Sequence, residues 1–220
     1  MEPAFVVLFG AAFLTGLSGA ASPGPMLTWN VASAARHGAL VGPVMVLGHA
    51  SVELPLVIAL AFGLGPIVRE PRLLAMLALV GAAVLFWMAW GTLRSLPALP
   101  DPLSLRTQPG ASRGHFRDAY SAGILLSLGN PFWALWWATV GAGLLGQSLA
   151  FGAVGLAVFF AGHILSDFGW YGLVSLAMAR GVRLMSRRLY QGLMATLGVA
   201  MAALAVLFAA NGVGGLLGSG

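Results

Sequence analysis

The sequence carries one short pattern twice: a glycine, a histidine and, four positions after the histidine, an acid. The two copies are Gly48-His49-x-x-x-Glu53 and Gly162-His163-x-x-x-Asp167, offset by 114 residues. On a helix, side chains four residues apart lie on the same face and can touch. Because histidine titrates near neutral pH, each pair is a candidate for moving a proton or contacting a cation.

Both pairs lie inside long apolar segments, where charged side chains are rare. A charge at the centre of a bilayer costs roughly 2.5–3.5 kcal/mol on insertion scales, so these faces should point into a helix bundle or a wet cavity. Two interpretations follow. In the first, Glu53 and Asp167 exchange protons or contact a cation, with the two histidines as their partners. In the second, the pairs are hydrogen-bonded and only hold helices together.

The amino-acid composition indicates whether this chain is surrounded by water or by lipid. Of its 220 residues, 59% are hydrophobic and only 8% are charged, too few to cover a soluble surface. We therefore predict an integral membrane protein with an all-α fold. A helix needs about 20 residues to cross the hydrocarbon core of a bilayer. Six apolar segments are long enough: 4–34, 39–62, 73–93, 119–146, 149–178 and 190–211.

Two residue types are absent, and each absence excludes some chemistry. Without cysteine there are no disulfides or thiolate ligands, and without lysine there is no phosphate-loop lysine and no Schiff base. We therefore expect no ATP-driven motor. We also expect that the protein is not an enzyme and has no cofactor. Only Met1, Glu2 and Pro3 precede the first apolar segment, without a basic region, so we interpret that segment as a retained span rather than a secretory signal.

All eleven positive charges are arginines, and their distribution predicts topology rather than a nucleic-acid surface. Nine of them follow the odd-numbered segments: Arg36, Arg94, Arg106, Arg113, Arg117, Arg180, Arg183, Arg187 and Arg188. Arg69 and Arg72 lie on the other side, beside Glu70. Cytoplasmic loops are enriched in positive charge, so these odd-numbered loops should be cytoplasmic and both termini should lie outside the cytoplasmic membrane.

The two His–acid patterns indicate an internal repeat of three segments each. Three crossings reverse the direction of the chain, so the second half should be inverted relative to the first. Inverted repeats are typical of secondary transporters, whose halves rock around a central site. The predicted boundaries are 1–94 for the first repeat, 95–118 for a proline-rich cytoplasmic linker, 119–213 for the second repeat and 214–220 for a tail.

Proline and glycine interrupt the first and fourth segments. The two breaks are Ser22-Pro23-Gly24-Pro25 and Asn130-Pro131. Each break frees backbone groups that protein, water or a ligand must satisfy, because proline lacks an N–H donor and glycine permits unusual torsions. We predict that all six residues of the breaks, together with nearby Trp133, bind the substrate. Simple proline kinks are the alternative, and packing is the ordinary role of the other aromatic residues.

The breaks resemble those of a known family, the LysE/RhtB translocators, which are bacterial and archaeal exporters of amino acids and related metabolites. Ser22-Pro23-Gly24-Pro25 resembles the family's Pro-Gly-Pro signature, Asn130-Pro131 resembles its Asn-Pro, and Glu53 lies where members commonly carry an acid. The resemblance implies efflux of a small amino acid or analogue, driven by the proton gradient.

The sequence also departs from that family. Trp136 stands where members similar to the exporters of basic amino acids carry an acid, and Phe132 stands where many members carry lysine. These departures imply an apolar or zwitterionic cargo. His49, His163 and Asp167 are not part of the family signature, so their predicted roles rest on spacing and setting alone.

A divalent-metal transporter is the main alternative. The four residues His49, Glu53, His163 and Asp167 could supply two imidazoles and two carboxylates to a metal ion, although the chain lacks the histidine-rich or acidic loops that often accompany metal carriers. An intramembrane hydrolase fits less well, because no His-Glu-x-x-His spacing is present. We expect a polytopic secondary exporter working by alternating access. Its partners would be a small amino acid, protons and the lipid bilayer but no nucleic acid, and the sequence leaves a monomer or a homodimer open.

Overall fold

The computed structural model describes residues 2–64, 70–102, 104 and 113–218. These residues form helices and connecting turns with no strand among them, which confirms the all-α prediction for the described part of the chain. Within these described ranges, five helices are long and apolar enough to cross a membrane: Pro3–Ala20, Val41–Gly63, Pro71–Ala98, Gly152–Gly181 and Arg187–Leu217. The segment 119–146, expected to be a further span, is divided among shorter helices.

The first half of the chain is interrupted at the predicted break. Its helices are α1 (Glu2–Ala20), α2 (Pro25–His37), α3 (Val41–Ala59) and α5 (Pro71–Ser95). Pro23 and Pro25 have no N–H to continue the helix, and Pro25 starts α2 at a position where that donor would be unpaired in any case. α3 continues through a π-helical turn, η1 (Leu60–Leu64).

The next helix, α6 (Arg113–Leu128), starts inside the segment 95–118 that was predicted to be the linker. The elements that follow are α7 (Pro131–Trp136), the π-helical turn η4 (Trp137–Gly141), α8 (Ala142–Leu149), α9 (Gly152–Gly181) and α10 (Arg187–Gly218). Short 3₁₀ turns, η2 (Leu96–Ala98) and η5 (Val182–Leu184), follow α5 and α9. The helix break at Asn130-Pro131 therefore separates α6 from α7.

Some of the predictions concern residues outside the described ranges. Residues 105–112 of the proposed linker lie outside them, as do Arg69 and Arg106. At the other end of the chain, α10 continues to Gly218, so most of the predicted tail at 214–220 is helical.

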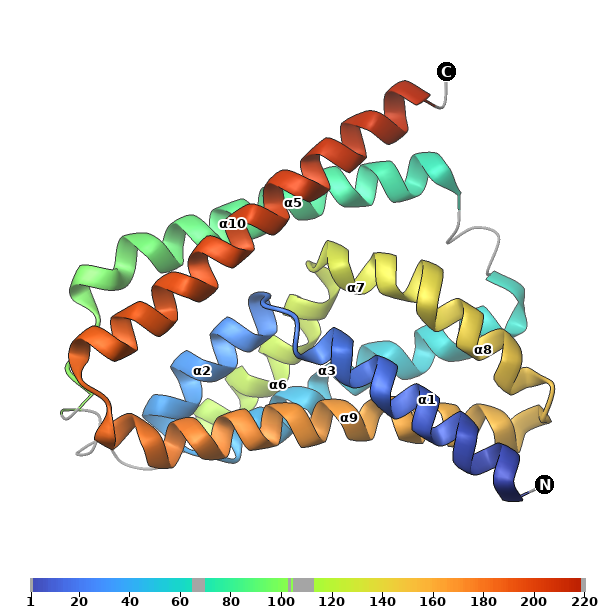
Figure 1. The fold of residues 1–220 in the computed structure, drawn as a ribbon, viewed down its shortest axis with the longest axis horizontal. Coiled ribbons are helices and arrows are strands. Elements are labelled where there is room, and N and C mark those ends of the chain that lie inside the picture. The colour runs from blue at the N-terminus through green and yellow to red at the C-terminus, as the bar shows by residue number, and fades with distance from the viewer. Residues whose placement is uncertain (1, 65–69, 103, 105–112, 219–220) are drawn as a thin grey trace.

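The helices form two layers (Figure 1). α5 and α10 pair with each other and lie above the remaining helices in this view. In the other layer α1 and α2 pack along α9, while α3 packs on both α6 and α9. The first helix of each half therefore contacts the middle helix of the other half, α1 on α9 and α6 on α3.

The arginine-rich helix ends gather at one end of the molecule (Figure 1). α2, α5 and α9 end there, and α6 and α10 begin there, whereas α1 begins and α10 ends at the opposite end. Arg187 donates a hydrogen bond to the Pro97 carbonyl at 2.8 Å, and Gln191 donates to the Leu96 carbonyl at 2.9 Å. These contacts join the start of α10 to the turn that follows α5.

His37, at the end of α2 and outside the spans, stacks on His115 of α6 with ring centroids 3.7 Å apart. Burial lowers the pKa of His37, the nearby charges of His115 and Arg36 lower it further, and Asp118 opposes them. The unfolded chain therefore takes up this proton at a higher pH than the folded protein. The neutral stack contributes stability above the unfolded pKa of about 6.5, and that contribution is lost as the pH falls through the lowered folded pKa.

We predict that acidification weakens this contact between α2 and α6. Lowering the pH from about 7.5 to about 5.5 should reduce the Tm of the wild-type protein in detergent more than that of His37→Gln, whose side chain does not titrate in this range. Arg188→Gln, which alters an exposed residue, is the control and should keep the wild-type pH dependence. Equal Tm losses for wild type and His37→Gln would contradict this account.

Candidate functional site

The four ionisable residues identified in the sequence meet in one buried cluster between α3 and α9. Across the two helices, His163 Nε2 lies 3.0 Å from Glu53 Oε2, and His49 Nε2 lies 3.6 Å from Asp167 Oδ2. Within each helix the distance between the histidine and the acid is 3.0 Å in α3 and 3.8 Å in α9. All four residues are at most 5% exposed. The spacing predicted two pairs, and the packing of α3 on α9 joins them.

Glu53 is held by two indole groups that the sequence interpretation did not connect to it. Trp133 Nε1 and Trp137 Nε1 each donate a hydrogen bond to Glu53 Oε1 at 2.8 Å. An indole N–H can only donate, so Oε1 serves as an acceptor for both. Trp133 and Trp137 are four residues apart, and the same helical rule that pairs each histidine with its acid would have placed these two rings on one face.

The Nδ1 atoms of the two histidines have different neighbours. His49 Nδ1 lies 2.6 Å from Ser127 Oγ on α6, and this hydroxyl donates onward to the Gly123 carbonyl. His163 Nδ1 has no hydrogen-bond partner among the residues that the structure describes. Here α1 presents Gly16, and a Cβ added at that position would lie 2.9 Å from His163 Nδ1. Gly16 therefore faces the His163 ring, at the position where the Ser127 hydroxyl contacts the His49 ring.

Aromatic rings surround His163. Trp136 stacks on it with centroids 4.7 Å apart, Trp137 meets it edge-on at 5.2 Å, and Phe159 stacks at 6.3 Å. These rings fix the plane of the imidazole and offer their π faces to a protonated ring.

Asp167 has an oxygen without a hydrogen bond. Asp167 Oδ2 is buried and has no hydrogen-bond partner within the described part of the chain, although the Nε2 atoms of His49 and His163 lie within 3.8 Å of it. A buried polar atom without a partner is costly, so this oxygen is available to a cation or an N–H-bearing ligand. The two histidines, when protonated, balance the charge of the two ionised acids, which makes the cluster tolerable inside a bilayer.

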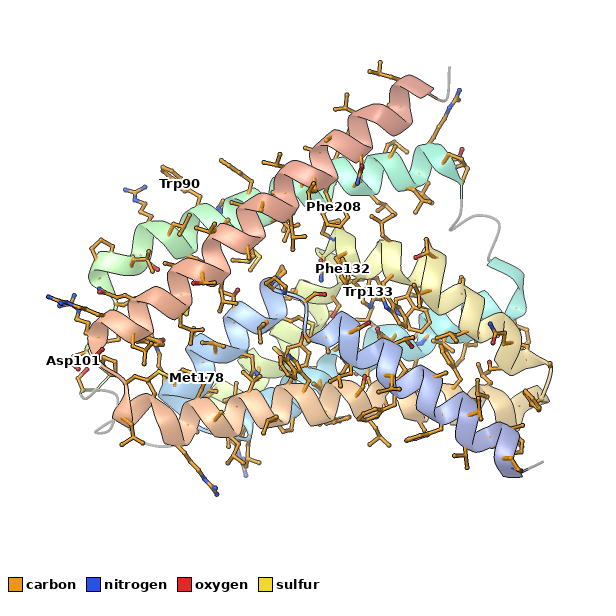
Figure 2. The ribbon with its side chains drawn as sticks, in the orientation of Figure 1. Trp90, Asp101, Phe132, Trp133, Met178 and Phe208 are labelled. Carbon is orange, nitrogen blue, oxygen red and sulfur yellow. The ribbon has the colours of Figure 1, made fainter. Side chains whose placement is uncertain are left out.

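Two neighbouring cavities lie beside the cluster. The first, of about 50 Å³, is bounded by the four ionisable residues together with side chains of α1, α2 and α7. The second, of about 30 Å³, lies at the break between α1 and α2. A cavity needs roughly 10–15 Å³ to admit one water molecule, so both are large enough for water or a small polar group. Figure 2 shows Phe132 and Trp133 at the start of α7 near the middle of the molecule, with Phe208 of α10 above them.

All but one of the residues predicted to bind substrate line one or both of these cavities. Ser22, Pro23, Gly24 and Pro25 line the second cavity, Trp133 lines the first, and Asn130 lines both. Pro131 is absent from the described lining of either cavity, because it is buried against α5. Its ring lies so close to Gly81 of α5 that a Cβ there would overlap it.

The helices that start at the two breaks differ in whether a side chain accepts a hydrogen bond from their first backbone N–H groups. Asn130 Oδ1 accepts a hydrogen bond from the Phe132 N–H at 3.1 Å and thereby caps α7. Gly24 precedes α2 without any side-chain cap. Among the described residues, the first N–H groups of α2 therefore have no side-chain acceptor, and Gly24, Pro25 and Met26 at this helix start line the second cavity.

Comparison with known proteins identifies the family of this chain. The sequence pattern of the family described as "LysE type translocator" matches residues 17–212. A protein of Bacillus subtilis (strain 168) named "Putative amino acid efflux protein YcgF" is 23% identical over 212 residues, which cover 96% of this chain and 99% of that protein. No solved structure matches this chain. Since the family pattern extends over both breaks and the whole ionisable cluster, the chain belongs to the LysE type translocator family.

Proposed function

We propose that this protein is a secondary exporter of a small neutral amino acid, coupled to protons and working by alternating access. The observation that carries the proposal is the meeting of two His–acid pairs in one buried cluster, which faces a cavity between interrupted helices. Membership of a translocator family supports a transporter rather than an enzyme, and the name of the Bacillus subtilis relative supports an amino acid as cargo.

An inverted repeat, with halves at 1–94 and 119–213, is part of this proposal. Corresponding contacts in the two halves support it, since α1 packs on α9 as α6 packs on α3. Gly162 and Gly48 lie at these two contacts, where a Cβ would crowd the carbonyls of Phe9 and Tyr120. Seven residues after Phe9 and Tyr120 come Gly16 and Ser127, the residues that face the two histidines.

We infer the orientation of the protein in the membrane from the positions of its arginines. The arginine-rich helix ends lie together, so we place that end in the cytoplasm, the linker 95–118 with it, and both termini outside the cytoplasmic membrane. We take these small cavities to represent a closed conformation. Transport then requires the helices around the cluster to separate toward each side in turn.

The cluster offers complementary groups to a zwitterion. The unpartnered Asp167 Oδ2 would accept hydrogen bonds from the cargo ammonium, and the uncapped N–H groups that follow Gly24 would meet its carboxylate. Glu53 and the two histidines would hold the exchanged protons. Because the cargo ammonium would add a positive charge to the cluster that holds the exchanged protons, binding of cargo would favour their release, which is the condition for exchange.

The test is export from proteoliposomes with and without a pH gradient. Wild-type protein should release small neutral amino acids when the gradient is imposed. Asp167→Asn should reduce this release by about tenfold or more, because the amide cannot supply the same charge to the ammonium. Ser166→Ala, a neighbour whose hydroxyl bonds only to the His163 carbonyl among the described contacts, should stay near wild type. Uptake of manganese or zinc ions without amino-acid release would overturn the proposal.

A further inference from the structure

The second cavity reaches beyond the residues assigned so far, to the layer formed by α5 and α10. Leu85 of α5 and Leu204 of α10 line it together with the residues of the break between α1 and α2. Leu85 is 1% exposed and belongs to an apolar cluster with Met201 and Phe208 of α10. This wall is therefore built by the α5–α10 pair, which contributes nothing to the ionisable cluster.

The two cavities adjoin, and they differ in the ionisable residues that line them. They share five lining residues: Gly19, Met26, Asn130, Phe132 and Tyr171. The first contains all four ionisable residues of the cluster. The described lining of the second contains no acid, histidine or arginine. A ligand whose ammonium reaches Asp167 in the first cavity can thus extend an apolar group into the second.

We propose that Leu85 and Leu204 form the compartment for the cargo's side chain, and that the cargo is a neutral amino acid with a short aliphatic side chain. The inference rests on the proposed function, which supplies the ammonium contact. The described lining of this compartment contains no acid, so a cationic side chain would be buried there without a partner, and that selects against basic amino acids. The two leucines limit length, since packed side chains on both sides resist further volume.

Leu204 is the better position to alter, because it is only partly buried. Leu204→Ala enlarges the compartment, and Leu204→Phe fills it. Leu207 is three residues along the same helix and 59% exposed, so Leu207→Ala is a matched control that removes the same atoms from the outer surface. Leu85→Ala enlarges the same compartment from α5 and provides a second, independent variant.

The experiment measures export of alanine, valine, phenylalanine and lysine from proteoliposomes under one fixed pH gradient. Wild type and Leu207→Ala should prefer alanine and valine over phenylalanine and lysine by about tenfold or more, the discrimination expected from a pocket that rejects extra volume or an unpaired charge. Leu204→Ala and Leu85→Ala should each raise the ratio of phenylalanine to alanine severalfold, and Leu204→Phe should lower the ratio of valine to alanine.

The outcomes separate the two proposals. Export by wild type with selectivity that neither leucine changes would overturn the assignment of this compartment and leave the proposed function standing. Preferred export of lysine would also overturn it. If wild type releases none of the four amino acids, the proposed function fails and this inference fails with it. A fall in total export without a change in the ratios counts against the compartment, because a ratio is independent of the amount of folded protein.

Discussion

Glu53→Gln should abolish export driven by a pH gradient while the protein remains folded and inserted. Glutamine has nearly the shape of glutamate, and its amide oxygen can still accept from Trp133 and Trp137, which both bond to Oε1 at 2.8 Å. It cannot bind and release a proton. Loss of a positioned proton-transferring group lowers rates by about a hundredfold or more. The measurement is the initial rate of amino-acid release from proteoliposomes with and without the gradient.

The control for this substitution keeps the carboxyl group. Glu53→Asp should retain part of the gradient-driven rate, because a shorter acid still exchanges protons but reaches His163 less well than the present 3.0 Å contact. Circular dichroism and the elution volume in detergent should match wild type for both variants. A normal gradient-driven rate for Glu53→Gln would exclude a coupling role for this residue and leave the second interpretation, a structural bond between helices.

The composition of the cluster was predictable from the sequence because it depends on a local rule. Residues four apart share a helix face, and lipid does not tolerate ionised groups, so both His–acid pairs had to point inward. Which atoms would meet across the helices was not predictable. His163 lies closer to Glu53, at 3.0 Å, than to Asp167 in its own helix, at 3.8 Å. That distance depends on where α9 crosses α3, which local periodicity does not determine.

The interrupted helices were also predictable, since proline removes a donor wherever it stands, and α1 and α6 both end at the expected breaks. The contacts that the residues of the breaks make could not be predicted. Pro131 was expected to bind substrate but packs on Gly81 of α5, because a proline ring at a helix start is also an apolar surface. Trp137 was assigned to packing, yet its N–H bonds Glu53. An indole serves both purposes, and its sequence position does not distinguish them.

Gly48→Ala should destabilise the protein by roughly 1–3 kcal/mol, the usual cost of forcing atoms into a packed contact. A Cβ at Gly48 would overlap the backbone carbonyl of Tyr120, so α3 and α6 would have to separate. A backbone carbonyl inside a helix cannot rotate away as a flexible side chain can. The measurement is the Tm in detergent, which should fall by several degrees, and Gly162→Ala should do the same through its 2.7 Å approach to the Phe9 carbonyl.

The matched control is Gly169→Ala, which lies on α9 with nothing within 4 Å of the added Cβ. It should leave the Tm unchanged or slightly higher, because alanine favours a helix over glycine by about 1 kcal/mol. If Gly48→Ala and Gly169→Ala behave alike, close approach is not the reason for the repeated glycine. If they differ as expected, the glycine has a second consequence. It brings α6 near enough for Ser127 to hold His49 at 2.6 Å, so Gly48→Ala should also impair gradient-driven export per folded molecule.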